Sequence, residues 1–160
     1  MIRIRRIEAG DRSRVLDLLA STGAFQEHEL AVALELIDTA LNKPEQTDYH
    51  PYVLESSDRI VAYACFGKNP MTRSTYDLYW LATRAEQMRR GFGRALFAFV
   101  EEEIARQGGK LLVIETSSKE SYAKSRQFYL GVGCELAASI PGFYDDADDK
   151  VIYFKRLCGA

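Results

Sequence analysis

The chain has 160 residues, of which 47% are hydrophobic and 28% charged, and this composition is that of a folded globular protein and excludes a largely disordered one. The length suits one compact fold, so we expect residues 1–160 to form a single domain. Lysine and arginine total 21 against 23 acidic residues, and the resulting net charge of −2 disfavours a nucleic-acid partner, which usually requires a basic surplus.

The cysteines point to a reducing environment. Cys65, Cys134 and Cys158 are odd in number and widely spaced, which fits neither a disulfide framework nor a paired-cysteine metal site. We therefore predict a cytoplasmic protein without a bound metal. The first six residues mix isoleucine with arginine, unlike the apolar core of a signal peptide, and the apolar runs fall short of the roughly 20 residues that span a bilayer. We expect no membrane partner.

Hydrophobic periodicity predicts the elements of the first half of the chain. Leu30, Leu34, Ile37 and Leu41 recur at helical spacing and form one apolar stripe, which Pro44 ends. Alternation of isoleucine with charge at residues 2–8 predicts a half-exposed strand. The expected elements are a strand at 2–8, a short helix containing Val15–Leu19, a helix at Phe25–Lys43, and two strands at Tyr52–Ser56 and Arg59–Phe66 joined by a Ser57-Asp58 turn.

The second half alternates strands with helices. The expected elements are strands at Tyr76–Thr83, Leu111–Thr116, Cys134–Ile140 and Val151–Arg156, and helices at Gly91–Gln107 and Ser121–Gly133. A crossover helix implies that the strands at 76–83 and 111–116 run parallel, whereas closely coupled strands pair antiparallel. We therefore predict a mixed, mostly antiparallel sheet of about seven strands with helices on both faces.

A glycine-containing turn between a strand and a helix is the most informative segment. Gly91 and Gly93 let a backbone approach a ligand without hindrance from a Cβ, and the helix that follows presents unpaired amides and a partial positive charge. Arg89, Arg90 and Arg94 beside that helix end are unfavourable unless an anion binds there. We interpret the turn as a phosphate site. The alternative is a solvated loop that uses glycine only to turn.

The spacing of the glycines limits which phosphate ligand fits. The Walker A pattern is absent from the sequence, and a dinucleotide fingerprint needs a third glycine where this chain has Leu96. Glu115 lies about 20 residues beyond the glycines, where an acid would bind a ribose. Only 160 − 115 = 45 residues follow it, too few for a second nucleotide-binding half. A nicotinamide-dependent oxidoreductase is therefore the weaker alternative.

Two segments carry a resemblance to a known family. Leu81-Ala82-Thr83 leads into Arg89–Leu96 (RRGFGRAL), and Phe128–Cys134 (FYLGVGC) follows later. With the element order, they resemble the acetyl-CoA-binding strand and turn and the tyrosine helix of the GCN5-related N-acetyltransferases (GNAT family). The resemblance covers essentially the whole chain and implies an α+β fold with α/β/α layers. Met88 departs from the usual glutamine or arginine, and Ser121 from a frequent asparagine.

The resemblance implies acetyl-CoA as co-substrate and assigns its binding residues. Backbone groups of the strand end would pair with the pantetheine arm, and backbone amides of the turn would hold the pyrophosphate. The implied acetyl-CoA-binding residues are Leu81, Ala82, Thr83, Arg89, Arg90, Gly91, Phe92, Gly93, Arg94 and Ala95.

The resemblance also implies that Tyr129 is the general acid for the departing thiolate, since a phenol with a pKa of about 10 stays protonated at pH 7. Without the resemblance, Tyr129 reads as a core aromatic beside Phe128. A base is needed to deprotonate an amine. Glu115, among apolar residues of an inner strand where burial would raise its pKa, and Asp77, in the preceding strand, are the candidates. Either carboxylate alternatively has a structural role.

The expected reaction is direct attack of a primary amine on the thioester of acetyl-CoA. The acceptor is expected to be a small amine, an amino-acid derivative or an amine-bearing antibiotic, rather than a protein terminus. A CoA-binding sensor without catalysis on the same fold is the alternative, and relatives suggest a homodimer. His28 and His50 are expected to be solvated rather than catalytic.

Overall fold

The computed structural model describes residues 1–157, so Cys158 lies outside the described residues. The chain divides into two compact units, each built from two segments. The first consists of Met1–Gly67 and Tyr79–Glu102, and the second of Lys68–Leu78 and the chain from Glu103 onward. In the described part, a helix long and apolar enough to cross a membrane is not found. The prediction of a single functional domain stays a prediction.

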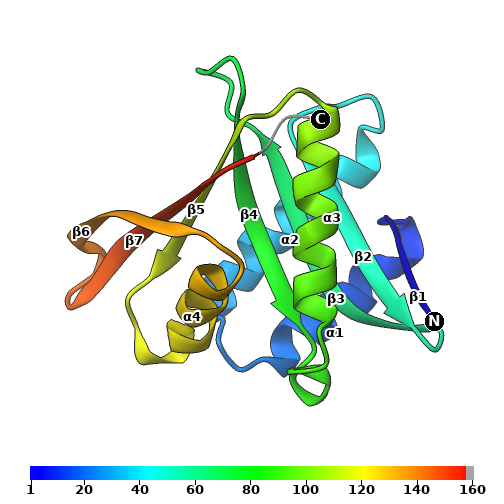
Figure 1. Cartoon of the computed structure of the whole chain (residues 1–160). Helices are drawn as coiled ribbons and strands as arrows, with labels where there is room; N and C mark the ends of the chain where they lie inside the picture. Colours follow the sequence, from blue (N-terminus) through cyan, green and yellow to red (C-terminus); the bar gives the residue numbers. More distant parts are fainter. Residues whose placement is uncertain (158–160) are drawn as a thin grey trace. The chain divides into compact units, whose positions relative to one another are not determined.

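Seven strands are hydrogen-bonded in the order β1-β2-β3-β4-β5-β7-β6 (Figure 1). Strands β4 and β5 pair parallel, while β1 with β2, β2 with β3, β5 with β7 and β6 with β7 pair antiparallel. The elements are β1 (Ile2–Arg6), η1 (Ala9–Asp11), α1 (Arg12–Ser21), α2 (Glu27–Asn42), β2 (His50–Ser56), β3 (Arg59–Lys68), β4 (Thr75–Thr83), η2 (Ala85–Gln87), α3 (Phe92–Arg106), β5 (Leu111–Ser117), η3 (Glu120–Tyr122), α4 (Ala123–Gly131), β6 (Glu135–Asp145) and β7 (Asp148–Arg156). The predicted mixed, mostly antiparallel α+β fold is confirmed.

The first unit has a helical layer on each face of its strands. The apolar stripes of α1 and α2 pack on one face, where Val53 of β2 and Tyr63 and Cys65 of β3 are completely buried. Because side chains alternate along a strand, Tyr52 and Phe66 point to the other face, and the Tyr52 ring lies 4.9 Å from that of Phe99 in α3. Figure 1 shows α3 in front of β2 and β3, and α1 behind them.

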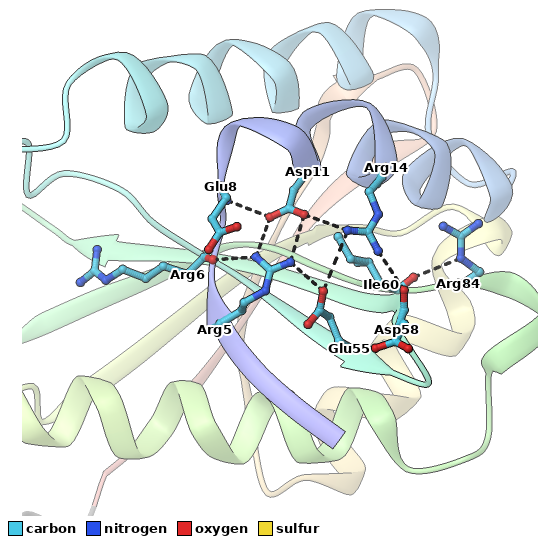
Figure 2. Close-up of polar contacts among 9 residues, drawn as sticks. All are labelled: Arg5, Arg6, Glu8, Asp11, Arg14, Glu55, Asp58, Ile60 and Arg84. Carbon is cyan, nitrogen blue, oxygen red and sulfur yellow. Dashed lines mark hydrogen bonds and ion pairs between the residues drawn. The ribbon is translucent and has the colours of Figure 1, made fainter. Parts of the chain in front are cut away.

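A buried carboxylate joins β1, α1 and β2 of this unit. Asp11 is 2% exposed and accepts hydrogen bonds from the Arg5 guanidinium at 2.7 and 3.1 Å, from Arg14 at 3.2 Å and from the Glu8 amide at 2.8 Å. Arg5 also donates to Glu55 at 2.7 Å, so the group forms a continuous network (Figure 2). Every charge in the network has a partner, which a buried carboxylate requires.

The second unit is built on β5. The first half of β4 pairs parallel with it, from Thr75↔Leu111 to Leu78↔Ile114, and β7 pairs antiparallel on its other side. Leu112, Ile114 and Tyr153 are buried on one face of these strands. At the entry to β5, a Cβ on Gly109 would collide with Ile104 and Tyr76, so only glycine allows this close approach.

The last hairpin differs from the predicted boundaries. Strand β6 continues past the predicted Ile140 to Asp145, and β7 begins at Asp148 instead of the predicted Val151, with an irregularity in the pairing between Ile140 and Asp145. The chain reverses over two residues, and Ala147 there has φ +59°. Every residue of β6 is exposed, so burial imposes no alternation on its sequence, and its length follows instead from pairing with β7.

Candidate functional site

The end of β4 belongs to the first unit and leads directly to the predicted turn. Ala82 is 8% exposed and packs in the core under α1 and α2, whereas Leu81 and Thr83 are half-buried. Residues 76, 78 and 82 of β4 are buried, whereas residues 77, 79, 81 and 83 are half-buried or exposed. Among the residues that the resemblance assigns to acetyl-CoA at this strand end, Ala82 therefore belongs to the core, and Leu81 and Thr83 are more accessible.

The predicted turn lies between β4 and α3, as expected, and its backbone is strained. Arg89 has φ +63° and Gly91 has φ +83°, both in the left-handed region. Glycine adopts this region freely, but in any other residue it costs about 1–2 kcal/mol. A Cβ on Gly91 would meet nothing within 4 Å, so the space beside the backbone is open. Backbone strain of this kind clusters at binding sites.

The turn also gathers positive charge at a helix end. Helix α3 begins at Phe92, and its first turn is closed by the Ala95 amide, which bonds the Gly91 carbonyl at 3.0 Å. The first amides of a helix have no carbonyl one turn earlier to bond, so they point out of the helix end. Arg89, Arg90 and Arg94 are exposed around this end. The combination suits an anionic phosphate ligand.

Tyr129 belongs to the second unit and is buried. It lies on α4, is 6% exposed, and its ring centre is 5.6 Å from that of Phe128 and 6.0 Å from that of Tyr153 in β7. The Cys134 amide bonds the Tyr129 carbonyl at 2.9 Å, which ties the end of α4 to the start of β6. Burial, and secondarily Cys134, raises the pKa of the Tyr129 phenol well above its ordinary value. The hydroxyl therefore stays protonated at neutral pH.

The two carboxylates considered as bases lie on one face of the second unit. Asp77 pairs with Val113, and Glu115 lies two residues beyond Val113 on the same strand face. Asp77 is half-buried, and its pKa is raised, mainly by burial and also by the negative charge of Glu115. A hydrogen bond from Asn69 and the positive charge of Lys150 lower the pKa, but they only partly offset this increase. A carboxylate with a raised pKa is better suited to accept a proton near neutral pH.

The predicted burial of Glu115 is wrong. Its side chain is 46% exposed, and its carboxylate lies 2.8 Å from Nζ of Lys150, whose side chain is only 13% exposed. Lys150 also stands 4.0 Å from the centre of the Phe143 ring. The buried apolar residues before Glu115, Leu112 and Ile114, face the opposite side of the strand, so the Glu115 side chain itself is outside the core.

The expectation for the histidines is wrong at one position. His50 begins β2, is 9% exposed, and stacks on Phe66, with ring centres 5.0 Å apart. This contact could not be predicted, because the two residues become neighbours only through the pairing of β2 with β3. His28, on the first turn of α2, is exposed as predicted. Among the described residues, a cluster of histidine, cysteine or acidic side chains able to hold a metal ion is not found.

Sequence reasoning missed two buried charged residues, one in each unit. Arg84 follows β4 and is 5% exposed, and Asp148 in β7 is 4% exposed and accepts a hydrogen bond from the Ser117 hydroxyl. Their burial could not be predicted from residue type, because arginine and aspartate are usually exposed. The position of Arg84, immediately after a buried strand, was the one available signal.

The comparisons with known proteins decide the family. Residues 14–133 match the model of the acetyltransferase (GNAT) family. The chain belongs to the GNAT family. A GNAT-family protein from Desulfovibrio desulfuricans agrees with this assignment: it is 37% identical, its structure superposes with a TM-score of 0.94, and the match covers 99% of this chain and 100% of that one.

More distant structures share the fold of this GNAT chain. The ribosomal-protein-S18-alanine N-acetyltransferase from Escherichia coli is 20% identical, with a TM-score of 0.78 over 100% of this chain and 96% of that one. A Salmonella typhimurium protein whose structure was solved with its cofactor acetyl-CoA is 17% identical, with a TM-score of 0.75, and the match covers 99% of this chain and 95% of that one. A significant match to a curated protein sequence is not found.

Proposed function

We propose that this GNAT chain transfers the acetyl group of acetyl-CoA to a primary amine. The observation that carries the proposal is the turn before α3. Its strained backbone at Arg89, the open space beside Gly91 and its exposed arginines have a physical reason when a pyrophosphate binds there. The Salmonella typhimurium protein of the same fold binds acetyl-CoA, which supports this ligand.

The proposed binding mode uses two neighbouring parts of the first unit. Backbone amides from Arg89 to Ala95 would hold the pyrophosphate, with Gly91 and Gly93 allowing close approach and the arginines supplying charge. Backbone groups of Leu81, Ala82 and Thr83 would pair with the amide groups of the pantetheine arm, as an added strand pairs with a sheet edge. The pairing of β4 with β5 runs from Thr75 to Leu78, so the backbone of Leu81, Ala82 and Thr83 lies beyond it.

The proposed chemistry divides between the two faces of the second unit. Tyr153 pairs with Ile114 and Asp77 with Val113, so their side chains lie on opposite faces, and Tyr129 packs on the face of Tyr153. We assign the acid to Tyr129, whose raised pKa keeps a proton available for the leaving thiolate. We assign the base to Asp77, since Glu115 is already paired with Lys150. Because Asp77 lies on the other face from Tyr129, the proton of the attacking amine would pass to its carboxylate through water rather than directly.

The acceptor is proposed to be a small cationic amine or amino-acid derivative. On the strand face that contains Asp77 and Glu115, two negative carboxylates outnumber the positive ammonium of Lys150, and this negative charge would attract a cation. Among structures of the same fold, one enzyme acetylates the alanine of a ribosomal protein and another acetylates aminoglycosides. A homodimer and a cytoplasmic location stay predictions from the sequence.

Calorimetry with acetyl-CoA and with NAD tests the ligand, and release of free thiol from acetyl-CoA in the presence of different amines tests the reaction. The amines should include aminoglycosides, amino-acid amides and a peptide that begins with alanine. We expect acetyl-CoA to bind, NAD not to bind, and at least one small amine to release thiol. Binding of NAD in place of acetyl-CoA would end the proposal, and acetyl-CoA binding without thiol release would favour a sensor.

A further inference from the structure

Arg84 is a buried arginine between the two parts of the proposed acetyl-CoA site. It follows Thr83 directly and precedes the segment that ends in the turn at Arg89–Gly91. Its side chain is 6% exposed, which is rare for arginine, and such burial is stable only when the guanidinium is paired. The proposed function gives no role to this residue.

Three hydrogen bonds fix Arg84 to two other elements. Its backbone amide donates to the Val61 carbonyl of β3 at 2.8 Å. Its Nε donates to the carbonyl of Ile60 in the same strand at 3.3 Å (Figure 2). Nη1 donates to Oδ2 of Asp17 in α1 at 2.9 Å. The two side-chain bonds leave from two different nitrogens held in one plane, Nε and Nη1, whereas lysine has a single nitrogen that cannot occupy both positions.

The residues after Arg84 are attached to the same region. The Ala85 amide donates to the Ser21 hydroxyl at the end of α1 at 3.3 Å, and the Gln87 amide returns to the Arg84 carbonyl at 2.9 Å. Glu86 pairs with Arg59 at 2.9 Å, but both side chains are about half exposed, so this pair contributes little. The path from β4 to the turn is therefore fixed mainly at Arg84 and Ala85.

We propose that Arg84 is a positioning residue for acetyl-CoA binding. This inference rests on the proposed function, since it concerns the same site. The pantetheine-pairing strand end and the phosphate-binding turn must be held at the spacing of one ligand, and Arg84 fixes the chain between them. Arg89 keeps its strained left-handed backbone conformation only if the chain on both sides of it is fixed in place. The hydrogen bonds of Arg84 fix the chain on the side that precedes Arg89. A preorganised turn loses less entropy when the ligand binds.

The test compares Arg84→Met with a matched control, Arg5→Met. Both variants remove a paired arginine from the first unit, but Arg5 contacts Asp11 and Glu55 and not the segment before the turn. We expect Arg84→Met to weaken acetyl-CoA binding, measured by calorimetry, by at least about tenfold, while kcat at saturating acetyl-CoA changes less than about twofold. Arg5→Met should lower stability and leave the affinity unchanged.

Two further variants keep the test decisive if Arg84→Met does not fold. Arg84→Lys keeps the charge but loses one of the two side-chain acceptors, so its affinity should be intermediate. Asp17 is 74% exposed, so Asp17→Asn should fold, and we expect it to weaken binding about threefold by replacing a charged acceptor with a neutral one.

The outcomes separate the two proposals. Unchanged affinity in Arg84→Met, or in Asp17→Asn when the first variant does not fold, would overturn this inference alone. An equal loss of affinity in Arg5→Met would do the same, because the effect would then follow general destabilisation. If the unsubstituted protein does not bind acetyl-CoA, the proposed function fails and this inference with it.

Discussion

Nζ of Lys150 lies 2.8 Å from Oε2 of Glu115, and this ion pair distinguishes Glu115 of β5 from Asp77, the carboxylate of β4 on the same face of the paired strands. The ammonium also stands over the Phe143 ring at 4.0 Å, so Lys150 has a defined position. Glu115 is thereby engaged with a cation, whereas Asp77 is half-buried and has a raised pKa. A base needs an available carboxylate, and Asp77 meets this condition, whereas Glu115 is held in an ion pair.

We expect Asp77→Asn to lower kcat/KM by about 10²- to 10⁴-fold, the usual contribution of a general base. Glu115→Gln is the matched comparison on the same face, and we expect it to change the rate by only a few-fold. Thiol release from acetyl-CoA with a fixed amine measures both. A large loss in Glu115→Gln with an active Asp77→Asn would reverse the assignment.

The pH dependence of stability gives a second measure of Asp77. Its pKa is raised in the folded protein, mainly by burial, so the folded state binds the proton more tightly than the unfolded chain does. The ionised carboxylate therefore lowers stability above that raised pKa, and this penalty disappears as the pH falls below the ordinary aspartate pKa. Urea unfolding should show Asp77→Asn more stable than the unsubstituted protein at pH 7, with the difference shrinking in acid. A less stable variant at pH 7 would contradict this.

Tyr129→Phe removes the proposed acid while keeping the ring that packs on Tyr153. We expect kcat to fall by about 10²-fold or more, with acetyl-CoA affinity changed less than about twofold. Since burial raises the pKa of Tyr129 well above 10, the loss should be the same at pH 7 and pH 9. Tyr153→Phe, another buried tyrosine of the same face, is the control and should stay active. Full turnover in Tyr129→Phe would assign the residue to the core alone.

Much of the fold was predictable because its elements have strong local patterns. The apolar stripe of α2 places Ile37 in the core, and the Ser57-Asp58 turn has φ +51° and +61°, the left-handed pair that a two-residue hairpin needs. Strand β6 was predicted too short, because it is exposed throughout and its sequence carries no burial pattern. Patterns that come from burial are lost where nothing covers a strand.

The candidate site was predictable only where it is local. The turn of Arg89–Gly91 was found from glycines between a strand and a helix, features that lie next to each other in the sequence. The partner of Glu115 was not found, because Lys150 approaches it only through the pairing of β5 with β7. The contact of Arg84 with Asp17 likewise depends on how α1 packs. Long-range contacts of this kind set which charged residue is buried and which is exposed.

Gly91→Ala tests the turn with an unusually close control. Gly91 and Gly108 have φ +83° and +89°, and a Cβ at either position meets nothing within 4 Å. Alanine should therefore cost each about 1 kcal/mol of stability through backbone strain alone. We expect only Gly91→Ala to weaken acetyl-CoA binding, by about tenfold, because a methyl group there obstructs the pyrophosphate. Equal affinity of the two variants in calorimetry would remove Gly91 from the site.

The Asp11 network should dominate the acid sensitivity of the first unit. Burial alone would raise the pKa of Asp11, but hydrogen bonds from Arg5 and the Glu8 amide outweigh it, and the net pKa is lowered. Its stabilising contribution is therefore present above the ordinary aspartate pKa and is lost as the pH falls through the lowered value. Asp11→Asn should cost about 3–5 kcal/mol at pH 7, measured by urea unfolding, and less in acid. Asp38→Asn, in an exposed pair with Arg12, should leave stability unchanged.

Arg89→Gly separates the strain of the turn from its charge. Arg89 has φ +63°, which glycine adopts without penalty, so the substitution should raise the free energy of unfolding by up to about 1 kcal/mol. Ala147→Gly, at φ +59° in the β6–β7 hairpin, should give a similar gain and controls for the backbone effect. Acetyl-CoA affinity should nevertheless fall in Arg89→Gly and stay constant in Ala147→Gly, because only the first removes a cation beside the proposed pyrophosphate. The loss of affinity in Arg89→Gly should become smaller as the salt concentration rises, because salt screens the charge. If the loss does not depend on the salt concentration, the Arg89 side chain contributes something other than its charge.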